Sequence, residues 1–293
     1  MAEFQNRATM STQAGCRARL IFLVILNLWG VLASFAVADE KPESLLSPDW
    51  HYGAYVDLNY AANFNTSTSH LWRSKLTTTH LSTFSPDLGM FYLKKEASQD
   101  SPWGIDVGGM AGYDTAGQVP STGQLGGAQV LQYVSRANVS YQSSIGNGLK
   151  FVGGLFNSFI GYESFYAKDN PNYTRSWIAD YSPYFLIGGG AIYPVNEQLD
   201  VGVYMVTDYN YLSYTNSQPK YAWQTTWRAT PNLKVMQNGF VGPQQTQTAF
   251  QYWRGFFNTM VEWSDTDYAI GLVYDVGSER QAQSPSHTPV SYT

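Results

Sequence analysis

Charged and amide side chains recur at alternate positions of this chain, inside stretches that are otherwise apolar. In LQYVSRANVSY, residues 131–141, Arg136 and Asn138 fall on one side of the alternation, and Val139 and Tyr141 fall on the other. Successive side chains of a β-strand point to opposite faces, so this segment predicts a strand with one polar and one apolar face. Carboxylate, amide and guanidinium groups placed in this way can line a path for water and ions.

The same alternation elsewhere in the chain gives a set of candidate lining residues. They are Asp57, Asn59, Asp106, Gln132, Arg136, Asn138, Lys150, Asp200, Asp208, Gln224, Arg228, Lys234, Asn238 and Glu262. As a set they predict a polar interior that tunes ion selectivity. For any single member, the simpler interpretation is that the side chain contacts water or pairs with a neighbour across two strands.

Catalysis and metal binding are not indicated by the residues. The four histidines are scattered, at His51, His70, His80 and His287, and the region after the N-terminal apolar run has no cysteine. No G-x-S-x-G motif is present, and the carboxylates of segment 160–183 have no spacing that specifies an acid–base pair. We therefore predict no catalytic residue, no metal, no cofactor and no enzymatic activity.

The polar side chains belong to segments that predict long strands. The clearest are 50–61, 103–113, 131–141, 199–209, 221–229 and 268–276, and the less regular ones are 87–95, 149–159, 184–193, 233–241 and 254–263. The clear segments are about 9–12 residues long, the length that a tilted strand needs to cross a bilayer. Strands of soluble proteins average about 5–6 residues. The eleven segments therefore predict an all-β, transmembrane, antiparallel up-and-down β-barrel over residues 50–276.

Connection lengths and composition favour the same fold. Long polar connections such as 160–183 alternate with short ones such as PVNEQ, 194–198, as the surface loops and periplasmic turns of outer-membrane barrels do. Aromatic residues make up 16% of the chain and charged residues only 13%, about half the usual share. Aromatics such as Trp103 and Tyr113 fall at predicted strand ends and suggest a girdle at each membrane interface. Arg136 at the lipid midplane would cost about 2–4 kcal/mol, so it is expected to face a water-filled lumen.

The N-terminus predicts a secretory signal peptide, residues 1–38. Arg17 and Arg19 precede an apolar run, 20–38, which ends in a small-residue triplet with Ala36 and Ala38 at its outer positions. Cleavage is expected after Ala38, followed by a periplasmic lead, 39–49. The alternative is an uncleaved anchor helix, because the run is nearly long enough to span a bilayer.

Cleavage at this point sets the charge and the cysteine content of the mature chain. The single cysteine, Cys16, precedes the apolar run, so neither a lipid anchor nor a disulfide is expected. Removing residues 1–38 takes away three of 17 basic residues and one of 22 acidic residues, so the formal net charge changes from −5 to −7. This acidic balance argues against nucleic acid as a partner.

Three further stretches carry a family resemblance. They are the GYE…KDN-NY-RS pattern at 161–176, the YP-N-QLDVGV pattern at 193–203, and ANVSY…IGNGL within 137–149. Together they resemble the OmpL-like beta-barrel porins of bacterial outer membranes. The resemblance covers 130–276 well and 50–113 loosely. It implies a membrane barrel with porin-like passive transport, and it transfers architecture better than substrate.

The end of the chain departs from the barrel pattern. Single-chain bacterial barrels have even strand numbers, whereas eleven candidate strands are counted here. Segment 277–293 shows no strand alternation and is expected to be a polar, non-barrel tail. We therefore expect a barrel truncated before its closing strands; the alternative is that one strand is miscounted.

The function expected from these features is passive diffusion of small hydrophilic solutes or ions through a polar lumen. The expected partners are outer-membrane lipid and these solutes, and the expected location is the bacterial outer membrane. One alternative is a barrel that displays long loops as an adhesin or receptor and conducts little, which a lumen plugged by 62–86 or 160–183 would favour. A third possibility, a barrel hydrolase, would need a catalytic Ser–His pair.

Overall fold

The computed structural model describes most of the chain after residue 48. The described residues are 49–64, 69–72, 75–118, 128–209, 216, 218–245, 249–280 and 290–292. The predicted signal peptide, its cleavage positions Ala36 and Ala38, and nearly all of the predicted lead 39–49 lie outside the described residues. Among the described residues, no helix has the length and apolar character needed to cross a membrane.

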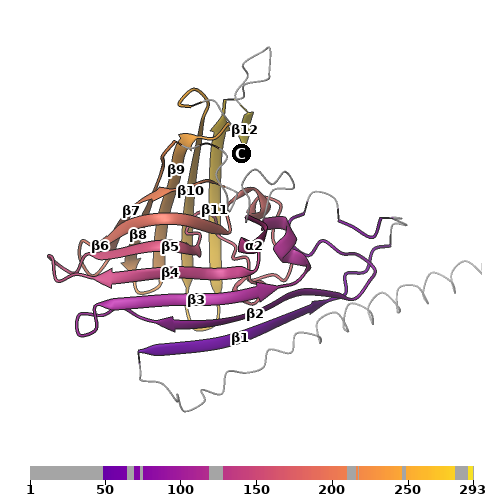
Figure 1. Cartoon of the computed structure of the whole chain (residues 1–293), viewed down its shortest axis with the longest axis horizontal. Helices are drawn as coiled ribbons and strands as arrows, with labels where there is room; N and C mark the ends of the chain where they lie inside the picture. The colour runs from indigo at the N-terminus through magenta and orange to yellow at the C-terminus, as the bar shows by residue number, and fades with distance from the viewer. Residues whose placement is uncertain are drawn as a thin grey trace, which may run out of the picture.

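One antiparallel sheet makes up the fold, with every strand hydrogen-bonded to its neighbours in chain order (Figure 1). The strands are β1 (Trp50–Asn59), β2 (Ser85–Lys95), β3 (Trp103–Ala111), β4 (Val134–Gln142), β5 (Lys150–Asn157), β6 (Phe185–Pro194), β7 (Leu199–Val206), β8 (Lys220–Thr230), β9 (Leu233–Pro243), β10 (Trp253–Ser264), β11 (Ala269–Glu279) and β12 (Val290–Tyr292). This confirms the all-β, up-and-down architecture. Among the described strands, β1 pairs with β2 alone, so the sheet curls without closing.

The predicted alternation of faces is visible in β1. Val56 and Leu58 are 68% and 61% exposed, whereas Asp57 between them is 4% exposed. The outer face of the curled sheet is therefore apolar and its inner face polar, as strand geometry requires. Aromatic side chains are exposed at both ends of the strands, for example Trp103 at one end and Tyr221 at the other.

Several predicted strand ends lie up to three residues from those of the structure, including the start of β4 and the end of β11. In segment 131–141 the strand β4 begins only at Val134, after the short helix α2 (Ala128–Leu131). A bulge opposite Gly108 and Gly109 turns the side chain of Ser135 inward, where it is fully buried. An extra residue on one strand reverses the alternation locally, which the periodicity of the sequence does not reveal. At the other end, residues 277–279 continue β11 and pair with β12, so part of the expected polar tail belongs to the sheet.

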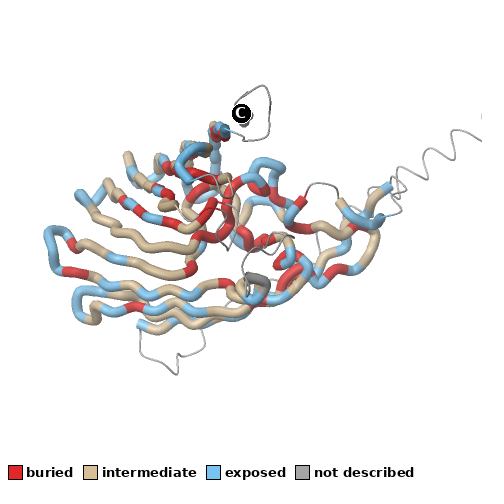
Figure 2. Tube along the Cα trace, turned by 45° about the horizontal axis from the view of Figure 1, so that its top comes forward, coloured by how far each residue is buried: buried red, intermediate tan, exposed pale blue. Residues whose placement is uncertain are grey.

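Long and short connections alternate as predicted, which places all the long ones at the same end of the sheet. The short turns are 96–102, 143–149, 195–198, 231–232 and 265–268, and the long connections are 60–84, 112–133, 158–184, 207–219 and 244–252. We call these the turn end and the loop end. Much of the buried chain gathers near the loop end (Figure 2).

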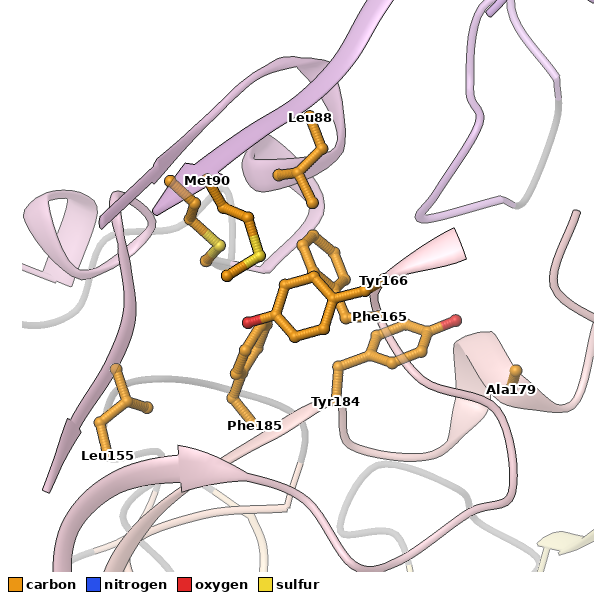
Figure 3. Close-up of a cluster of buried hydrophobic side chains, with 9 residues drawn as sticks. Leu88, Met90, Leu155, Phe165, Tyr166, Ala179, Tyr184 and Phe185 are labelled. Atoms are coloured by element: carbon orange, nitrogen blue, oxygen red, sulfur yellow. The ribbon is translucent and has the colours of Figure 1, made fainter. Parts of the chain in front are cut away.

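Two hydrophobic clusters occupy the inner side near the loop end. In the first, Phe165 packs edge-on against Tyr184 and Phe185, with ring centroids 5.5 and 5.1 Å apart, and Met90 lies opposite (Figure 3). The second cluster contains Ile160, Leu186, Tyr204, Val206, Tyr209, Ala222, Phe240 and Phe256. Each cluster joins strand residues to residues of the connection 158–184. Burial of a large apolar side chain is worth roughly 1.5–3 kcal/mol, so both clusters hold this connection against the sheet.

Candidate pore lining and the loop that crosses it

The connection 158–184, here called the inner loop, crosses the inner face of the sheet. At one side, the Tyr173 hydroxyl contacts Asp57 of β1. Towards the other side, the Asn238 amide of β9 donates to the Phe159 carbonyl at 2.6 Å. On the far side, the ring of Tyr162 packs against Gly271 of β11. A Cβ atom added to Gly271 would lie 3.1 Å from the Tyr162 hydroxyl oxygen. The inner loop therefore folds inward rather than projecting as a free surface loop.

Arg175 is the most deeply buried cation of the inner loop. Its guanidinium donates to the hydroxyl of Thr78 and to the carbonyls of Tyr173 and Phe165, and it lies 3.8 Å from the Asp114 carboxylate. Both side chains of this ion pair are fully buried. A buried guanidinium needs several partners to offset its desolvation, and the backbone carbonyls provide them.

Asp114, in the 3-10 helix η1 (Tyr113–Gln118), provides the carboxylate beside Arg175. It accepts a hydrogen bond from the Thr78 backbone amide at 2.7 Å. The pKa of Asp114 is raised to about 7, chiefly by burial and also by the nearby carboxylate of Asp87, while Arg175 opposes the shift. Burial dominates because removing the carboxylate from water penalises its charged form.

Tyr173 forms a second anchor between the inner loop and the sheet. Its hydroxyl is 2.6 Å from Asp57 Oδ1 of β1 and 3.2 Å from Asp87 Oδ2 of β2, and Ser85 also donates to Asp87. Burial, together with the two carboxylates, moves the pKa of Tyr173 far above its ordinary value. The phenol therefore stays protonated and remains a hydrogen-bond donor at any physiological pH.

Asp180 forms the third anchor, to the connection that precedes β2. Its carboxylate lies 3.1 Å from Lys75 Nζ in a buried ion pair and accepts hydrogen bonds from the Leu76 amide and the Tyr184 hydroxyl. Lys75 also donates to the Arg175 carbonyl at 2.5 Å. Such a network rigidifies a segment only when nearly every member is satisfied, as it is at Asp180.

Arg136, on β4, faces the inner side of the sheet as predicted, but it contacts protein more than water. It forms an ion pair with Asp106 at 3.6 Å, and its guanidinium lies 4.7 Å from the ring centroid of Tyr92 and 5.8 Å from that of Tyr166 in the inner loop. Its side chain is only 14% exposed. The inner loop thus covers the residue that the sequence placed against an open lumen.

A more exposed set of charges lies towards the turn end. Arg228 pairs with Asp200 at 2.7 Å, Lys234 pairs with Glu262, and Lys150 lies 3.9 Å from Glu96. Their side chains are between 26% and 49% exposed. Solvent reaches these charges.

The predicted lining residues therefore divide into three groups. Asp200, Arg228, Lys234, Glu262 and Lys150 lie on the accessible part of the inner face. Asp57, Asp208 and Asn238 are 4%, 1% and 0% exposed and contact protein instead of solvent. The remaining six sit at intermediate positions: Asn59, Asp106, Arg136, Asn138 and Gln224 are half-buried on strands, and Gln132 lies in the turn before β4.

Sequence reasoning missed several members of the anchors. Asp87 fell at the edge of a predicted strand, and Lys75 and Asp114 fell in connections whose alternation carries no information. Arg175 and Asp180 are charged residues of segment 160–183, and the sequence indicates no partner for either of them. A buried role for Tyr173 had no local signal, because its partner Asp57 is 116 residues away.

The accessible charges of the inner face form ion pairs and no compact cluster. Among the residues that the structure describes, no group of three or more His, Cys, Asp or Glu side chains is placed to hold a metal ion. The inner-face charges are instead spread as ion pairs between neighbouring strands.

An antiparallel up-and-down sheet of long strands, apolar outside and charged inside, with all its long loops at one end, defines a porin-like β-barrel protein. Residues 50–293 match the family model described as "Putative beta-barrel porin-2, OmpL-like", and the chain belongs to this family. No curated protein and no solved structure matches the chain. The family expected from the sequence is thereby confirmed.

Proposed function

We propose that the protein is a porin of the bacterial outer membrane, through which small hydrophilic solutes or ions diffuse passively. The observation that carries this proposal is the pairing of a lipid-compatible outer face with accessible charges on the inner face, such as Arg228 and Lys234. Family membership supports the same role, a channel rather than an enzyme. The outer face would contact outer-membrane lipid.

The inner loop narrows the passage in this proposal. It contacts the inner face near the loop end of β1, at Asp57, and near the turn end of β11, at Gly271, and it leaves charges such as Arg228 accessible. Solutes would therefore be small, and they would pass ion pairs between neighbouring strands. Solute choice would depend on size first and on charge second, because each accessible base has an acidic neighbour.

Display of the loops as an adhesin or receptor is the second candidate. The observation that favours it is the buried network of Arg175, Asp180 and Tyr173, which fills the loop end with protein. A barrel with this role would conduct little. The two candidates make opposite predictions for conductance.

The test is single-channel recording on the full chain after export and processing by a Gram-negative host. Protein purified from the outer membrane is incorporated into a planar bilayer, and its N-terminus is sequenced to locate the cleavage point. A gel shift between unheated and heated samples controls for folding. Discrete, stable conductance steps are expected for a porin. Folded protein that gives no steps would refute the porin proposal and favour display.

A further inference from the structure

A polar row lies across the outer face of three neighbouring strands. Thr225 of β8 is directly opposite Gln237 of β9, and Gln237 is directly opposite Thr259 of β10. All three point outward, because the residues beside them in the chain, such as Asn238 and Met260, are buried on the inner side. Within β9, Gln237 is the one exposed residue.

The surroundings of this row are apolar. The next outward row towards the loop end contains Trp223 and Phe257, whose ring centroids are 5.4 Å apart, and the ring of Trp223 extends over Gly239. The next row towards the turn end contains Val235 and Val261. Gln237 is therefore a primary amide set in a surface of aromatic and aliphatic groups.

The row also lies deep within the apolar band. Thr259 is four residues from Trp263, an exposed aromatic near the turn end of β10. With a rise of about 3.4 Å per residue and a tilt of about 40°, this separation corresponds to about 10 Å along the membrane normal. The apolar band of an outer-membrane barrel is about 25 Å tall, so the Gln237 amide lies near its middle.

Acyl chains offer no hydrogen-bonding partner at this depth, so an exposed amide there is unfavourable. An amide both donates and accepts, which makes it complementary to the same amide of another molecule related by a two-fold axis. Close packing and interhelical or interstrand hydrogen bonds, rather than hydrophobicity, drive association inside a membrane. The Gln237 amide can form such a hydrogen bond, and the ring of Trp223, which lies over the neighbouring Gly239, provides a surface for close packing.

We propose that the outer face of β8–β10 around Gln237 is where two copies of this chain associate in the membrane. This inference rests on the membrane location in the proposed function. The two amides would pair across the interface, with the hydroxyls of Thr225 and Thr259 at their sides. Outward positions elsewhere, such as Val139 of β4 and Leu272 of β11, carry only apolar groups and would face lipid.

Cysteine cross-linking in native outer membranes tests the interface. In a Cys16→Ser background, which leaves the chain without cysteine, Gln237→Cys is expected to give a disulfide-linked dimer on mild oxidation. The matched control is Val139→Cys, also an outward position, 53% exposed on a distant strand. It is expected to give at least fivefold less dimer. Equal cross-linking at the two positions, or none at Gln237→Cys, would overturn the proposal.

Sedimentation equilibrium in detergent gives an independent measurement. Gln237→Leu is expected to raise the dissociation constant of the dimer about tenfold or more, whereas Gln224→Leu, the same substitution on the inner face of β8, should leave it unchanged. An unaltered constant in folded Gln237→Leu, checked by gel shift, would also overturn the proposal. Conductance separates the two ideas. A wild-type protein that is monomeric but gives stable conductance steps would refute only the proposed interface. A protein that forms the cross-linked dimer but gives no conductance steps would refute only the porin proposal.

Discussion

Replacing Tyr173 by phenylalanine should release the inner loop from the sheet. The substitution keeps the ring and removes one hydroxyl, which is 2.6 Å from Asp57 Oδ1 and 3.2 Å from Asp87 Oδ2. Asp57 is almost fully buried, and its second carboxylate oxygen has no hydrogen-bond partner among the residues that the structure describes. Without the phenol, the carboxylate loses the one side-chain donor that bonds to it from the inner loop.

The size of the effect follows from this geometry. A hydrogen bond to a charged group is worth about 1.5–3 kcal/mol, and the half-buried position of Tyr173 favours the lower part of that range. A loss of about 2 kcal/mol multiplies the population of the released loop by about 30. The apolar contacts of Phe165 and Tyr166 remain, so the loop should open transiently while the sheet stays folded.

Limited trypsin digestion of the folded protein measures this opening at the bond after Arg175. Arg175 is 3% exposed, so cleavage there requires release of the loop. The exposed Arg280, just after β11, gives an internal reference for protease activity. Cleavage at Arg175 relative to Arg280 should rise about 30-fold in Tyr173→Phe, in line with the population change. The matched control is Tyr268→Phe at the turn end, where the side chain is 71% exposed, and it should leave the ratio unchanged.

The reasoning fails if the cleavage ratio of Tyr173→Phe equals that of the wild type, since the hydroxyl would then contribute nothing to docking. An equal rise in Tyr268→Phe would also count against it, because the effect would not be specific to the anchor. If the protein conducts, the same substitution should add larger or noisier steps to its single-channel record. Greater cleavage with unchanged steps would mean that the inner loop does not lie in the conducting path.

Three further predictions test the electrostatics and the two faces. Because burial raises the pKa of Asp114 to about 7, its protonated side chain stabilises the fold fully below the ordinary carboxyl pKa, and this stabilisation is lost as the pH rises towards 7. In urea unfolding between pH 4 and 7.5, the free energy of unfolding should therefore fall less steeply with pH in Asp114→Asn than in the wild type. An unchanged slope would exclude Asp114 as the source of the fall. Charge reversal by Arg228→Glu should shift the reversal potential in a salt gradient towards cations, more than Arg136→Glu does, because the side chains are 49% and 14% exposed; identical potentials in all three proteins would place both outside the path. Val139→Arg puts a charge on the outer face and should cost about 2–4 kcal/mol of folding free energy in lipid, and wild-type stability of this variant would argue against lipid at that face.

Charge reversal should have different effects on the covered part and on the accessible part of the inner face. Arg136 and Arg228 both carry a positive charge on the same face, yet the first is stacked between tyrosines and the second pairs with Asp200 in solvent. Charge reversal at the covered position should therefore affect folding more than selectivity. The accessible position should show the opposite.

The sequence by itself determined which segments are strands, the faces of most of their side chains, and the order of loops and turns. Alternation of side chains is a property of each extended segment alone, so Val56, Asp57 and Leu58 report their faces without knowledge of any other residue. Connection lengths are equally local, and in an up-and-down sheet they place the long loops at one end. The resemblance in 161–176 and 193–203 then pointed to the family.

Tertiary structure alone decided which inward residues are reached by solvent. Asp57 and Arg228 carry the same sequence signal, and they differ because the inner loop covers the first and not the second. That loop is held by contacts between residues far apart in the chain, such as Tyr173 with Asp57 and Asp180 with Lys75. Periodicity assigns a residue to a face, but burial depends on what packs there, and no local pattern encodes the docking of one segment on another.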